Sequence, residues 1–548
     1  MPSTTQVLIA GAGPTGLAAA LVLRRNGIDV RIIEKQASTN PGSRGSGLRP
    51  RTLELFHQLE AKDIIEKSSQ VIPIRAYKPG TLEVAKDLWM ETVNEATPQI
   101  PYPSVQLMGQ GMTERLLRGH LAECGCNVEF ATELRSFEQN GDGVIAHIAR
   151  IEGDKEVTDT IHAQYLIGTD GARSVVRKQL GLAFLGETRE ETRMLTGDVR
   201  FTAEGLDRHH WHRFGDMNSK MVMLRPCPSI GTENDGFQVM LGGPEIDLNP
   251  LFANKQALCD KIAELVPAKF DFKEVIWYGE FRPNIRMVDK FSVGRVFVAG
   301  DAAHCHSPTG GQGLNSSVQD SVNLGWKLSY VLKGLSPPSL LETYSEERLP
   351  VIAEMLNLTT GVLNQSAIGT DASFVRPSRL LMLGVNHRTS SIVLEELSPA
   401  LAAVPAYGDS NVEGVLAAGD RAPDAPGLVD AKGGEHRFFD VFRTTYHTVL
   451  VFAPNVEAAT HIINAIDGKY AGVVRAVVVL PGSAFLDKDE KASSVLTLCD
   501  AHRHAYTGYR AHEGETRAVV VRPDGFIGAS VRTAEGVERY FAKIFVSA

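Results

Sequence analysis

The glycine motif Gly11-x-Gly13-x-x-Gly16 constrains the fold more than any other feature of this sequence. It joins a short apolar run at residues 7–10 to an apolar stretch that ends near residues 26–27, a pattern that predicts a strand, a tight turn and a helix. Gly11 permits the turn, Gly13 lets the backbone approach a pyrophosphate, and Gly16 allows the helix to pack closely on the strand. The N-terminus of the helix then faces the phosphate charge.

A second strand, predicted over residues 30–33, ends at Glu34, which follows Gly16 by 18 residues. At this spacing a carboxylate can accept hydrogen bonds from both hydroxyls of a ribose. Glycine turns before helices are common, so the motif alone leaves a purely structural turn open. The flanking strand, the helix and Glu34 together favour dinucleotide binding, without saying which dinucleotide.

Two later segments repeat the pattern of an apolar strand followed by an acidic turn. Residues 165–168 precede Asp170-Gly171, and residues 295–299 lead into Gly300-Asp301. Asp301 is therefore predicted at the carboxyl end of a strand, where open α/β sheets bind ligands and where a carboxylate can hold a polyol chain. A glycine-rich stretch then enters a helix predicted over residues 316–332, whose N-terminal amides could stabilise negative charge on a bound ring.

Length and charge narrow the classes of partner. A chain of 548 residues with 43% hydrophobic and 22% charged residues predicts several globular domains. The net charge of −9 argues against a generally cationic surface for nucleic acid or anionic membrane, and we find no apolar stretch of the roughly 18 residues needed to span a bilayer. Six scattered cysteines suit free thiols in a reducing compartment. We therefore expect a cytoplasmic protein with small-molecule partners, no nucleic acid and no membrane.

These separated motifs, in this order, resemble the class A FAD-dependent aromatic hydroxylases, the flavoprotein monooxygenases that include phenol hydroxylase and the polyketide hydroxylases. The segment Asp320-Ser-Val-Asn-Leu-Gly-Trp-Lys-Leu328 adds to the resemblance. What the resemblance implies is FAD, with NAD(P)H as a transient reductant that has no Rossmann unit of its own. The implied cofactor-binding residues are Gly11, Gly13, Thr15 and Gly16 at the pyrophosphate, Glu34 with the adjacent Lys35 at the adenosine ribose, Arg44 and Gln110 along the cofactor, Asp170 for FAD and indirectly NAD(P)H, Asp301 at the ribityl chain, and Leu314 and Asn315 near the isoalloxazine.

The resemblance also implies the reaction. NAD(P)H reduces FAD, O2 adds to give a flavin C4a-hydroperoxide, and its distal oxygen passes to an electron-rich aromatic ring. The carbonyl of Pro308 and the amides around Gly311 are the implied catalytic groups, shaping the peroxide pocket and the anion site of the reduced flavin. Two alternatives stay open: epoxidation or Baeyer-Villiger oxidation of a natural product on the same scaffold, and a flavin-binding module without turnover.

One position departs from the family. Phenol hydroxylase-like members often carry an acid two residues after Arg44, where it helps activate the phenol, whereas this chain has Ser46. Ser46 cannot serve as a carboxylate base, so another group or water removes the proton, or the ring reacts without it. The substrate class stays open for this reason.

The predicted fold class is α/β. We expect a Rossmann-like FAD-binding domain over 1–184 and 291–360, an inserted mixed-sheet substrate domain over 72–107 and 185–290, a helical linker over 361–410 and a C-terminal α/β domain over 415–548. The last resembles the thioredoxin-like tail of phenol hydroxylase and polyketide hydroxylases. It contains Cys499 as its only cysteine, which excludes dithiol exchange and leaves a structural or dimer-contact role, with a homodimer possible.

Simple structural interpretations suffice for other segments. Met223 and the alternating apolar residues near it are expected in the core of the substrate sheet. Pro350 is expected to break a helix, and the run from Glu346 to Arg348 to lie on a solvated helix face. Neighbouring residues of a strand point to opposite faces, so the histidines within 209–212 and 304–306 are not expected to bind one metal ion together.

Overall fold

The structure is a computed structural model that describes most of the chain. The described residues are 3–39, 41–153, 155–189, 193–231, 233–307, 310–366, 375–398, 404–408, 415–470, 472–482 and 495–546.

Four neighbouring parallel strands form the centre of the first sheet, in the order β20-β11-β1-β2. These are β20 (Val296–Val298), β11 (Lys155–Gly168), β1 (Ser3–Ala10) and β2 (Val30–Ile33). The strands are buried apolar runs, as expected when helices cover a parallel sheet. The sheet also contains β19 (Ser292–Val293), β8 (Val128–Glu129), β9 (Thr132–Gln139) and β10 (Val144–Glu152).

Helices α1 and α8 pack against each other beside this sheet. Helix α1 (Pro14–Arg25) begins within the glycine motif, with Gly13 as its N-cap, and is followed by Asn26 as its C-cap, close to the predicted end. Helix α8 (Gly313–Leu332) is buried along almost its whole length, and Gly325 allows the close contact because a Cβ there would lie 2.6 Å from Val22. The remaining helices of this part are α2 (Pro50–Gln58), α3 (Lys62–Glu66), α4 (Gln110–Glu123), α5 (Val175–Gln179) and α9 (Glu342–Ser366).

The second sheet has seven strands in the order β17-β13-β16-β15-β14-β5-β6. Their bounds are β17 (Phe270–Phe281), β13 (Met194–Ala203), β16 (Gly236–Gly242), β15 (Met221–Pro226), β14 (Trp211–Gly215), β5 (Ile74–Tyr77) and β6 (Val84–Leu88). One face packs on α6 (Asn249–Ala253) and α7 (Lys255–Leu265) through an apolar core. Both segments expected in a substrate sheet supply strands to it.

The C-terminal sheet has eight strands in the order β22-β29-β28-β25-β26-β27-β23-β24. The strands are β22 (Leu394–Glu395), β23 (Leu428–Asp430), β24 (Glu435–His436), β25 (His447–Phe452), β26 (Val474–Pro481), β27 (Leu496–Asp500), β28 (Arg517–Val521) and β29 (Ile527–Val531). Helices α11 (Val456–Ile466) and α13 (Ala534–Phe541) contribute to one apolar core, and α10 (Phe438–Val441) and α12 (His504–Tyr509) to the other.

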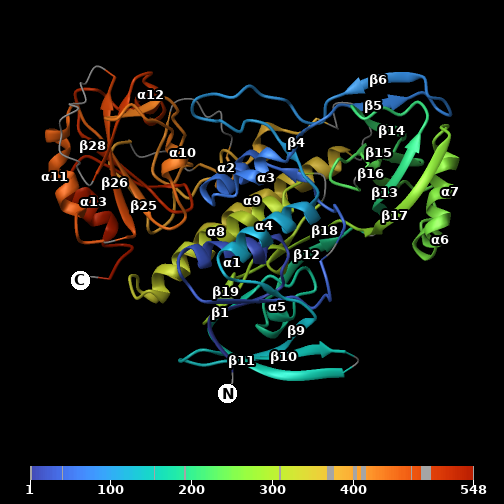
Figure 1. Ribbon diagram of the computed structural model, residues 1–548, viewed down its shortest axis with the longest axis horizontal. Helices are drawn as coiled ribbons and strands as arrows, with labels where there is room; N and C mark the ends of the chain where they lie inside the picture. Colours follow the sequence, from blue (N-terminus) through green and yellow to red (C-terminus); the bar gives the residue numbers. More distant parts are fainter. Residues whose placement is uncertain are drawn as a thin grey trace.

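Two small sheets complete the described strands. They are β12 (Phe184–Thr188) with β18 (Asn284–Val288) and β21 (His304–Cys305), and β3 (Gly47–Leu48) with β7 (Gln106–Leu107) and β4 (Ser69–Gln70). Figure 1 shows the C-terminal sheet and the seven-stranded sheet at opposite ends of the molecule, with α8 and α9 between them.

Two predictions about α9 and the segment after it are wrong. Helix α9 runs through Pro350 without ending there, since packing of the surrounding residues holds a helix that the proline alone would break. In the described part of the expected helical linker over 361–410, the α-helix extends to Ser366. Beyond it, the described residues contain a short 3-10 turn at Ser378–Leu381 and the two-residue strand β22.

The predicted solvated face on α9 is also wrong in part. Glu346 is exposed, but Glu347 and Arg348 are buried and paired with other charges.

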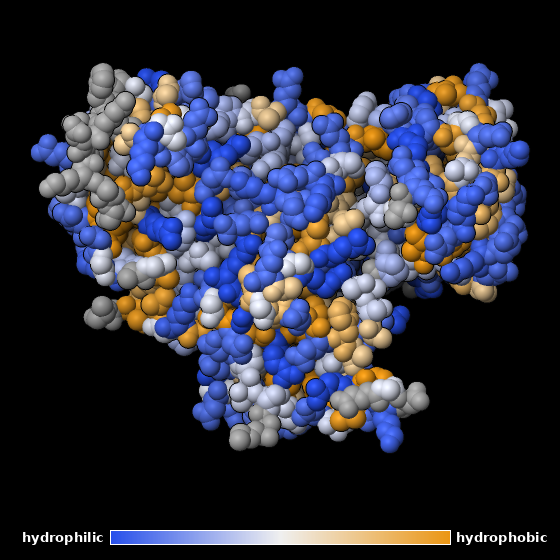
Figure 2. All heavy atoms as spheres, viewed as in Figure 1, coloured by the Kyte–Doolittle hydropathy of each residue, from blue (hydrophilic) through white to orange (hydrophobic). Residues whose placement is uncertain are grey.

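Hydrophilic residues cover most of the face seen in Figure 2, with smaller hydrophobic areas between them. All six cysteines are free thiols, and among the described residues we find no helix with the length and apolar character required to cross a membrane.

Candidate active site

The candidate site lies where the four central parallel strands end. Strand β1 leads into Gly11, β2 into Glu34, β11 into Asp170 and β20 into Asp301, and the four strands are neighbours in one sheet. These turns line one cavity of about 1330 Å³. The structure thus brings the separated sequence motifs together at one edge, the position where open α/β sheets bind ligands. Of the described residues predicted for the site, all but Gly16 line the cavity.

The three glycines of the first motif have different tasks. Gly11 has φ +105°, and a Cβ there would lie 2.4 Å from the carbonyl oxygen of Thr169. A Cβ on Gly16 would lie 2.0 Å from the carbonyl oxygen of Gly11, which confirms that Gly16 serves helix–strand packing. Gly13 borders the cavity, and a Cβ there would meet nothing within 4 Å. Gly13 therefore leaves open space at the N-terminus of α1.

Glu34 lies beside this opening. Its Oε2 accepts a hydrogen bond from the backbone N–H of Ala12 at 3.0 Å, and its Oε1 accepts one from the N–H of Gln36 at 3.0 Å. The carboxylate is thereby fixed at the cavity edge next to the exposed Lys35. Each carboxylate oxygen retains a second lone pair that a ribose hydroxyl could donate to.

Asp170 is bound within its own turn. Its Oδ1 accepts from the hydroxyl of Ser174, and its Oδ2 accepts from the backbone N–H groups of Val175 at 2.6 Å and Val176 at 3.2 Å. The carboxylate therefore caps the short helix α5 while the residue lines the cavity. Asp170 shapes the cavity wall through this turn.

Residues of neighbouring helices pack against the Gly300-Asp301 turn and form hydrogen bonds with it. Gly300 has φ +58°, and a Cβ there would lie 2.4 Å from Oγ1 of Thr15 on α1. The backbone N–H of Gly300 donates to Oδ2 of Asp320 on α8 at 3.0 Å, and the same oxygen contacts Nε2 of His304 at 2.7 Å. Oδ1 of Asp320 accepts from Nε of Arg348 at 2.7 Å. The turn that presents Asp301 is thus anchored to α1, α8 and α9.

Asp301 itself projects into the cavity. Its side chain is accessible from the cavity, but the surrounding protein desolvates the carboxylate and raises its pKa, while His304 and Arg44 act to lower it. A polyol hydroxyl at this position would restore the lost hydrogen bonds.

The glycine-rich loop enters α8 at the far side of the cavity. Gly311 has φ +58°, and its carbonyl oxygen accepts from Nδ2 of Asn315 at 2.7 Å. Oδ1 of Asn315 accepts from the backbone N–H of Arg49 at 2.7 Å, and the hydroxyl of Tyr407 donates to Oε1 of Gln312 at 2.6 Å. Leu314 lines the cavity beside them. Pro308, a predicted catalytic residue, lies outside the described residues.

Arg44 and Gln110 lie along the middle of the cavity. Arg44 has φ +37°, and its guanidinium lies 5.7 Å from the ring centroid of Trp277. Gln110 starts α4, and its Nε2 donates to Oε1 of Glu114 at 2.8 Å. Both side chains border the space between the strand ends and the seven-stranded sheet.

These residues fit FAD. Two helix N-termini, those of α1 and α8, border the cavity, and in the described structure no side chain caps either of them. Free amides at a helix N-terminus suit a pyrophosphate or the negative charge of a reduced ring. The open space at Gly13, the carboxylate of Glu34 and the carboxylate of Asp301 suit the phosphate, the ribose and the ribityl chain respectively.

The seven-stranded sheet forms the other wall. Along β15, Val222 and Leu224 belong to the core shared with α7, while Met221 and Met223 face the cavity. Met223 is buried in a small apolar cluster with Met221 and Ile74, as expected of a core residue, and it also lines the cavity. Sequence alternation identifies two faces of a strand but does not tell which face meets a helix and which meets a ligand. The methionines that line the cavity are Met90, Met194, Met217, Met221, Met223 and Met240.

Arg225, which the sequence analysis did not single out, lies on the same wall. Its Nη2 donates to the hydroxyl of Ser46 and to Oε1 of Gln238, the latter at 2.6 Å. Gln238 in turn donates from Nε2 to the carbonyl oxygen of Arg44 at 2.9 Å. The hydroxyl of Ser46 thus contacts a buried cation.

The histidines near the site have ordinary partners. His210 contacts Asp207 at 2.8 Å, and His212 lies between the hydroxyl of Tyr77 and the carbonyl oxygen of Asp207. His306 lines the cavity, and desolvation lowers its pKa to about 4. Within the ranges that the structure describes, no group of three or more His, Cys, Asp or Glu residues is placed to hold a metal ion.

Comparison with known proteins identifies the motif-bearing part. Residues 4–359 match the protein family described as FAD binding domain. A flavin-dependent monooxygenase from Mycobacteroides abscessus is 35% identical over 544 residues, covering 98% of this chain and 99% of that protein. A 6-methylpretetramide 4-monooxygenase from Streptomyces rimosus is 33% identical and covers 70% of this chain and 68% of that protein. The structure of aklavinone-11 hydroxylase in complex with FAD and aklavinone superposes with a TM-score of 0.77 at 24% identity, covering 99% of both chains.

Proposed function

We propose, from the premise that this chain belongs to the FAD-binding-domain family of flavin-dependent monooxygenases, that it hydroxylates an aromatic substrate, phenolic or polycyclic, at the expense of NAD(P)H and O2. The observation that carries the proposal is the single cavity bounded on one side by the four strand ends and on the other by the seven-stranded sheet. One oxygen atom enters the ring and the other leaves as water, while NAD(P)H and a proton supply the two electrons and two hydrogens.

FAD, when bound, supplies the electron transfer from NAD(P)H and the activation of O2. The residues of this chain bind and orient it. The open space at Gly13 and the amides of α1 receive the pyrophosphate, Glu34 with Lys35 receives the adenosine end, and Asp301 holds the ribityl chain. Leu314 and Asn315, at the start of α8, lie where the isoalloxazine would follow.

The loop before α8 is preorganised for its proposed catalytic role. Nδ2 of Asn315 donates to the carbonyl oxygens of both Gly311 and Gly47, which ties the described end of the loop to the segment around Gly47. The N-terminal amides of α8 favour negative charge beside them, and a wall of apolar side chains excludes water from the reacting ring. The proposed catalytic positions are Gly311, within this loop, and Pro308.

We further propose a thioredoxin-like fold for the C-terminal unit, over residues 415–548. Parallel strands β25 and β26 joined by α11, followed by the antiparallel pair β28–β29 and by α13, support it. Without a second cysteine beside Cys499 the unit cannot exchange a disulfide, so its proposed role is structural, with dimer contact as an additional one.

The proposal predicts a yellow protein whose NAD(P)H oxidation rises when an aromatic substrate is added. Purified protein is examined for FAD by its absorption spectrum, and products are analysed by mass for the gain of one oxygen from 18O2. Replacing Asp301 by Ala removes the ribityl partner and releases FAD. A colourless protein that does not take up FAD, or an Asp301→Ala variant with bound FAD and full turnover, would refute the assignment.

A further inference from the structure

Arg225 is a buried cation without a partner of opposite charge. The residue is 4% exposed and lines the cavity, and its Nε atom is buried with no hydrogen-bond acceptor in the described part of the chain. The acidic groups that act on it are Asp198 and Cys227, and Oδ2 of Asp198 instead accepts from the backbone N–H of Ser43 at 2.5 Å. A guanidinium keeps its charge when buried, so this site carries an uncompensated positive charge.

Three of the other buried arginines contact a carboxylate directly, whereas Arg177 donates to the carbonyl oxygens of Ala302 and Ala172. Arg51 pairs with Glu54 at 2.8 Å, Arg348 with Asp320 at 2.7 Å and Arg522 with Glu347 at 2.7 Å. Burying an unpaired charge costs several kcal/mol, which a ligand of opposite charge would offset. The absence of an ion pair at Arg225, among the residues described, therefore points to a ligand that brings the negative charge.

The surroundings of Arg225 define what kind of anion fits. The guanidinium lies 5.5 Å from the ring centroid of Trp211, and the next cross-strand pair on the same face of the sheet is Met223 with Met240. Methionine sulfur and aromatic faces contact aromatic ligands favourably. One fixed cation in an apolar, aromatic wall suits a ring that carries a single anionic oxygen better than a phosphate or a polyanion.

Two polar neighbours fix the direction of Arg225. Ser46 and Gln238 both accept from Nη2, and Gln238 is itself held by the carbonyl oxygen of Arg44. These contacts use Nη2, and Nε, which has no partner among the described residues, is itself buried, so Nη1 is the nitrogen left to meet a ligand in the cavity. Ser46 and Gln238 are thus positioning residues for Arg225.

We propose that Arg225 binds the oxygen of the aromatic substrate as a phenolate or enolate, and so replaces the carboxylate base that Ser46 cannot provide. The inference rests on the proposed hydroxylase function and narrows its substrate class to phenols and enols acidic enough to be held as anions. The phenol or enol releases its proton to water, and Arg225 stabilises the anion that remains. The negative oxygen raises the electron density of the ring carbons that accept the new oxygen atom.

The experiment measures the ionisation of a bound phenol with FAD-loaded enzyme in the oxidised state, which needs no turnover. The probes are 4-nitrophenol and 4-nitro-1-naphthol, whose anions absorb visible light, and they are followed by difference spectra as the pH is varied. An opposite charge within about 4–6 Å lowers the pKa of an acid by about 1–3 units, so the wild type should lower the pKa of a bound probe by that amount.

Three variants distinguish binding from folding. Arg225→Met should abolish the shift in probe ionisation while retaining FAD, and Arg225→Lys should restore part of it because the charge returns without the forked donors. Arg208→Met is the matched control: Arg208 donates to the carbonyl oxygen of Gly236 at 2.9 Å and lies 4.6 Å from the ring of Phe237, on the face away from the cavity. Its replacement should leave the shift unchanged.

Several outcomes would overturn the inference. They are a wild-type enzyme that binds the probes as neutral phenols or not at all, an Arg225→Met variant with an unchanged shift, and an Arg208→Met variant that loses it equally. A protein that cannot bind FAD would instead overturn the proposed function, so the two failures are distinguishable.

Discussion

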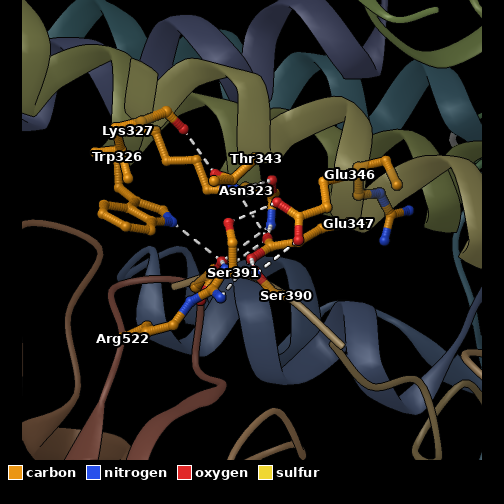
Figure 3. A network of polar contacts seen from close by, with 12 residues as sticks. Asn323, Trp326, Lys327, Thr343, Glu346, Glu347, Ser390, Ser391 and Arg522 are labelled. Atoms are coloured by element: carbon orange, nitrogen blue, oxygen red, sulfur yellow. Dashed lines mark hydrogen bonds and ion pairs between the residues drawn. The ribbon is translucent and has the colours of Figure 1, made fainter. Parts of the chain in front are cut away.

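Two regions of this molecule that contain buried charges differ in whether those charges form salt bridges within the chain. Where α8 and α9 meet the C-terminal sheet, the chain supplies both signs of charge. Glu347 accepts from Arg522 at 2.7 and 2.8 Å and from Nζ of Lys327 at 2.8 Å, and Asp524 pairs with the same arginine. Figure 3 shows Glu347, Lys327, Asn323, Ser390 and Arg522 converging at this contact.

In the cavity, Arg49 pairs with Glu91 at 2.8 Å, but two other charged groups make no such salt bridge. Arg225 makes no salt bridge among the residues described, since the nearby Asp198 accepts from Ser43 instead, and Asp301 faces open space. A buried charge that is paired within the chain contributes to holding two parts of the fold together, and one that is unpaired raises the free energy until a ligand arrives. In this protein, therefore, a salt bridge within the chain, more than burial itself, distinguishes charges that hold the fold together from charges that are available to a ligand.

The largest expected effect is on the paired region. Replacing Glu347 by Ala leaves Arg522 and Lys327 buried with less negative charge, and we expect the free energy of unfolding to fall by about 3–5 kcal/mol. Denaturant unfolding measures it. The control is Glu346→Ala, since the exposed Glu346 contacts only Ser391 in the described structure. Equal losses in the two variants would contradict the comparison.

A second prediction concerns pH. Burial lowers the pKa of His387 and of His447 to about 3, against an ordinary value of 6.5. As the pH falls below 6.5, the unfolded chain therefore binds protons that the folded chain does not. The free energy of unfolding then decreases between pH 6.5 and pH 3, by at most ~1.4 kcal/mol per pH unit for each histidine, whereas above pH 6.5 the contribution of these histidines is fully present.

Replacing His387 by Phe tests this slope. Neither ring nitrogen of His387 has a hydrogen-bond partner among the described residues, and the ring packs 4.3 Å from the centroid of Phe526. The variant should lose one histidine's share of the pH dependence between pH 6 and 5, as measured by unfolding at each pH. An unchanged slope would mean that His387 titrates normally in the folded state.

The smallest expected effect compares two open glycines. A Cβ on Gly13 or on Gly119 meets nothing within 4 Å, but Gly13 borders the cavity whereas Gly119 lies on α4 outside it. Gly13→Ala should weaken FAD binding by about tenfold, ~1.4 kcal/mol, with little loss of apoprotein stability. Gly119→Ala should leave FAD affinity unchanged. Equilibrium titration of apoprotein with FAD measures both, and equal affinities would show that the space at Gly13 is not reserved for a ligand.

Much of the fold around the cofactor site could be predicted from the sequence. The order of strand, turn and helix around Gly11 and Gly16 was predicted correctly, because local rules of glycine geometry and apolar periodicity specify it, although β1 begins at Ser3, four residues before the predicted strand. The same holds for the strand before Asp301 and for α8. The family and its cofactor followed from the order of these motifs.

The errors share a different cause. Glu347 and Arg348 were expected on a solvated helix face, and Pro350 was expected to break a helix, yet each outcome depends on what packs against the residue from distant parts of the chain. The sequence does not indicate that Arg225 lies at the site or that it contacts Ser46, since 179 residues separate the two.

The sequence by itself determined that four turns, each following a strand, would carry ligand-binding groups, because backbone geometry at glycine and at strand ends is a local property. Only the tertiary structure decided that these turns border one cavity, and which buried charges find a partner there. That decision depends on contacts between residues far apart in the chain, where desolvation and pairing of charges outweigh any local preference.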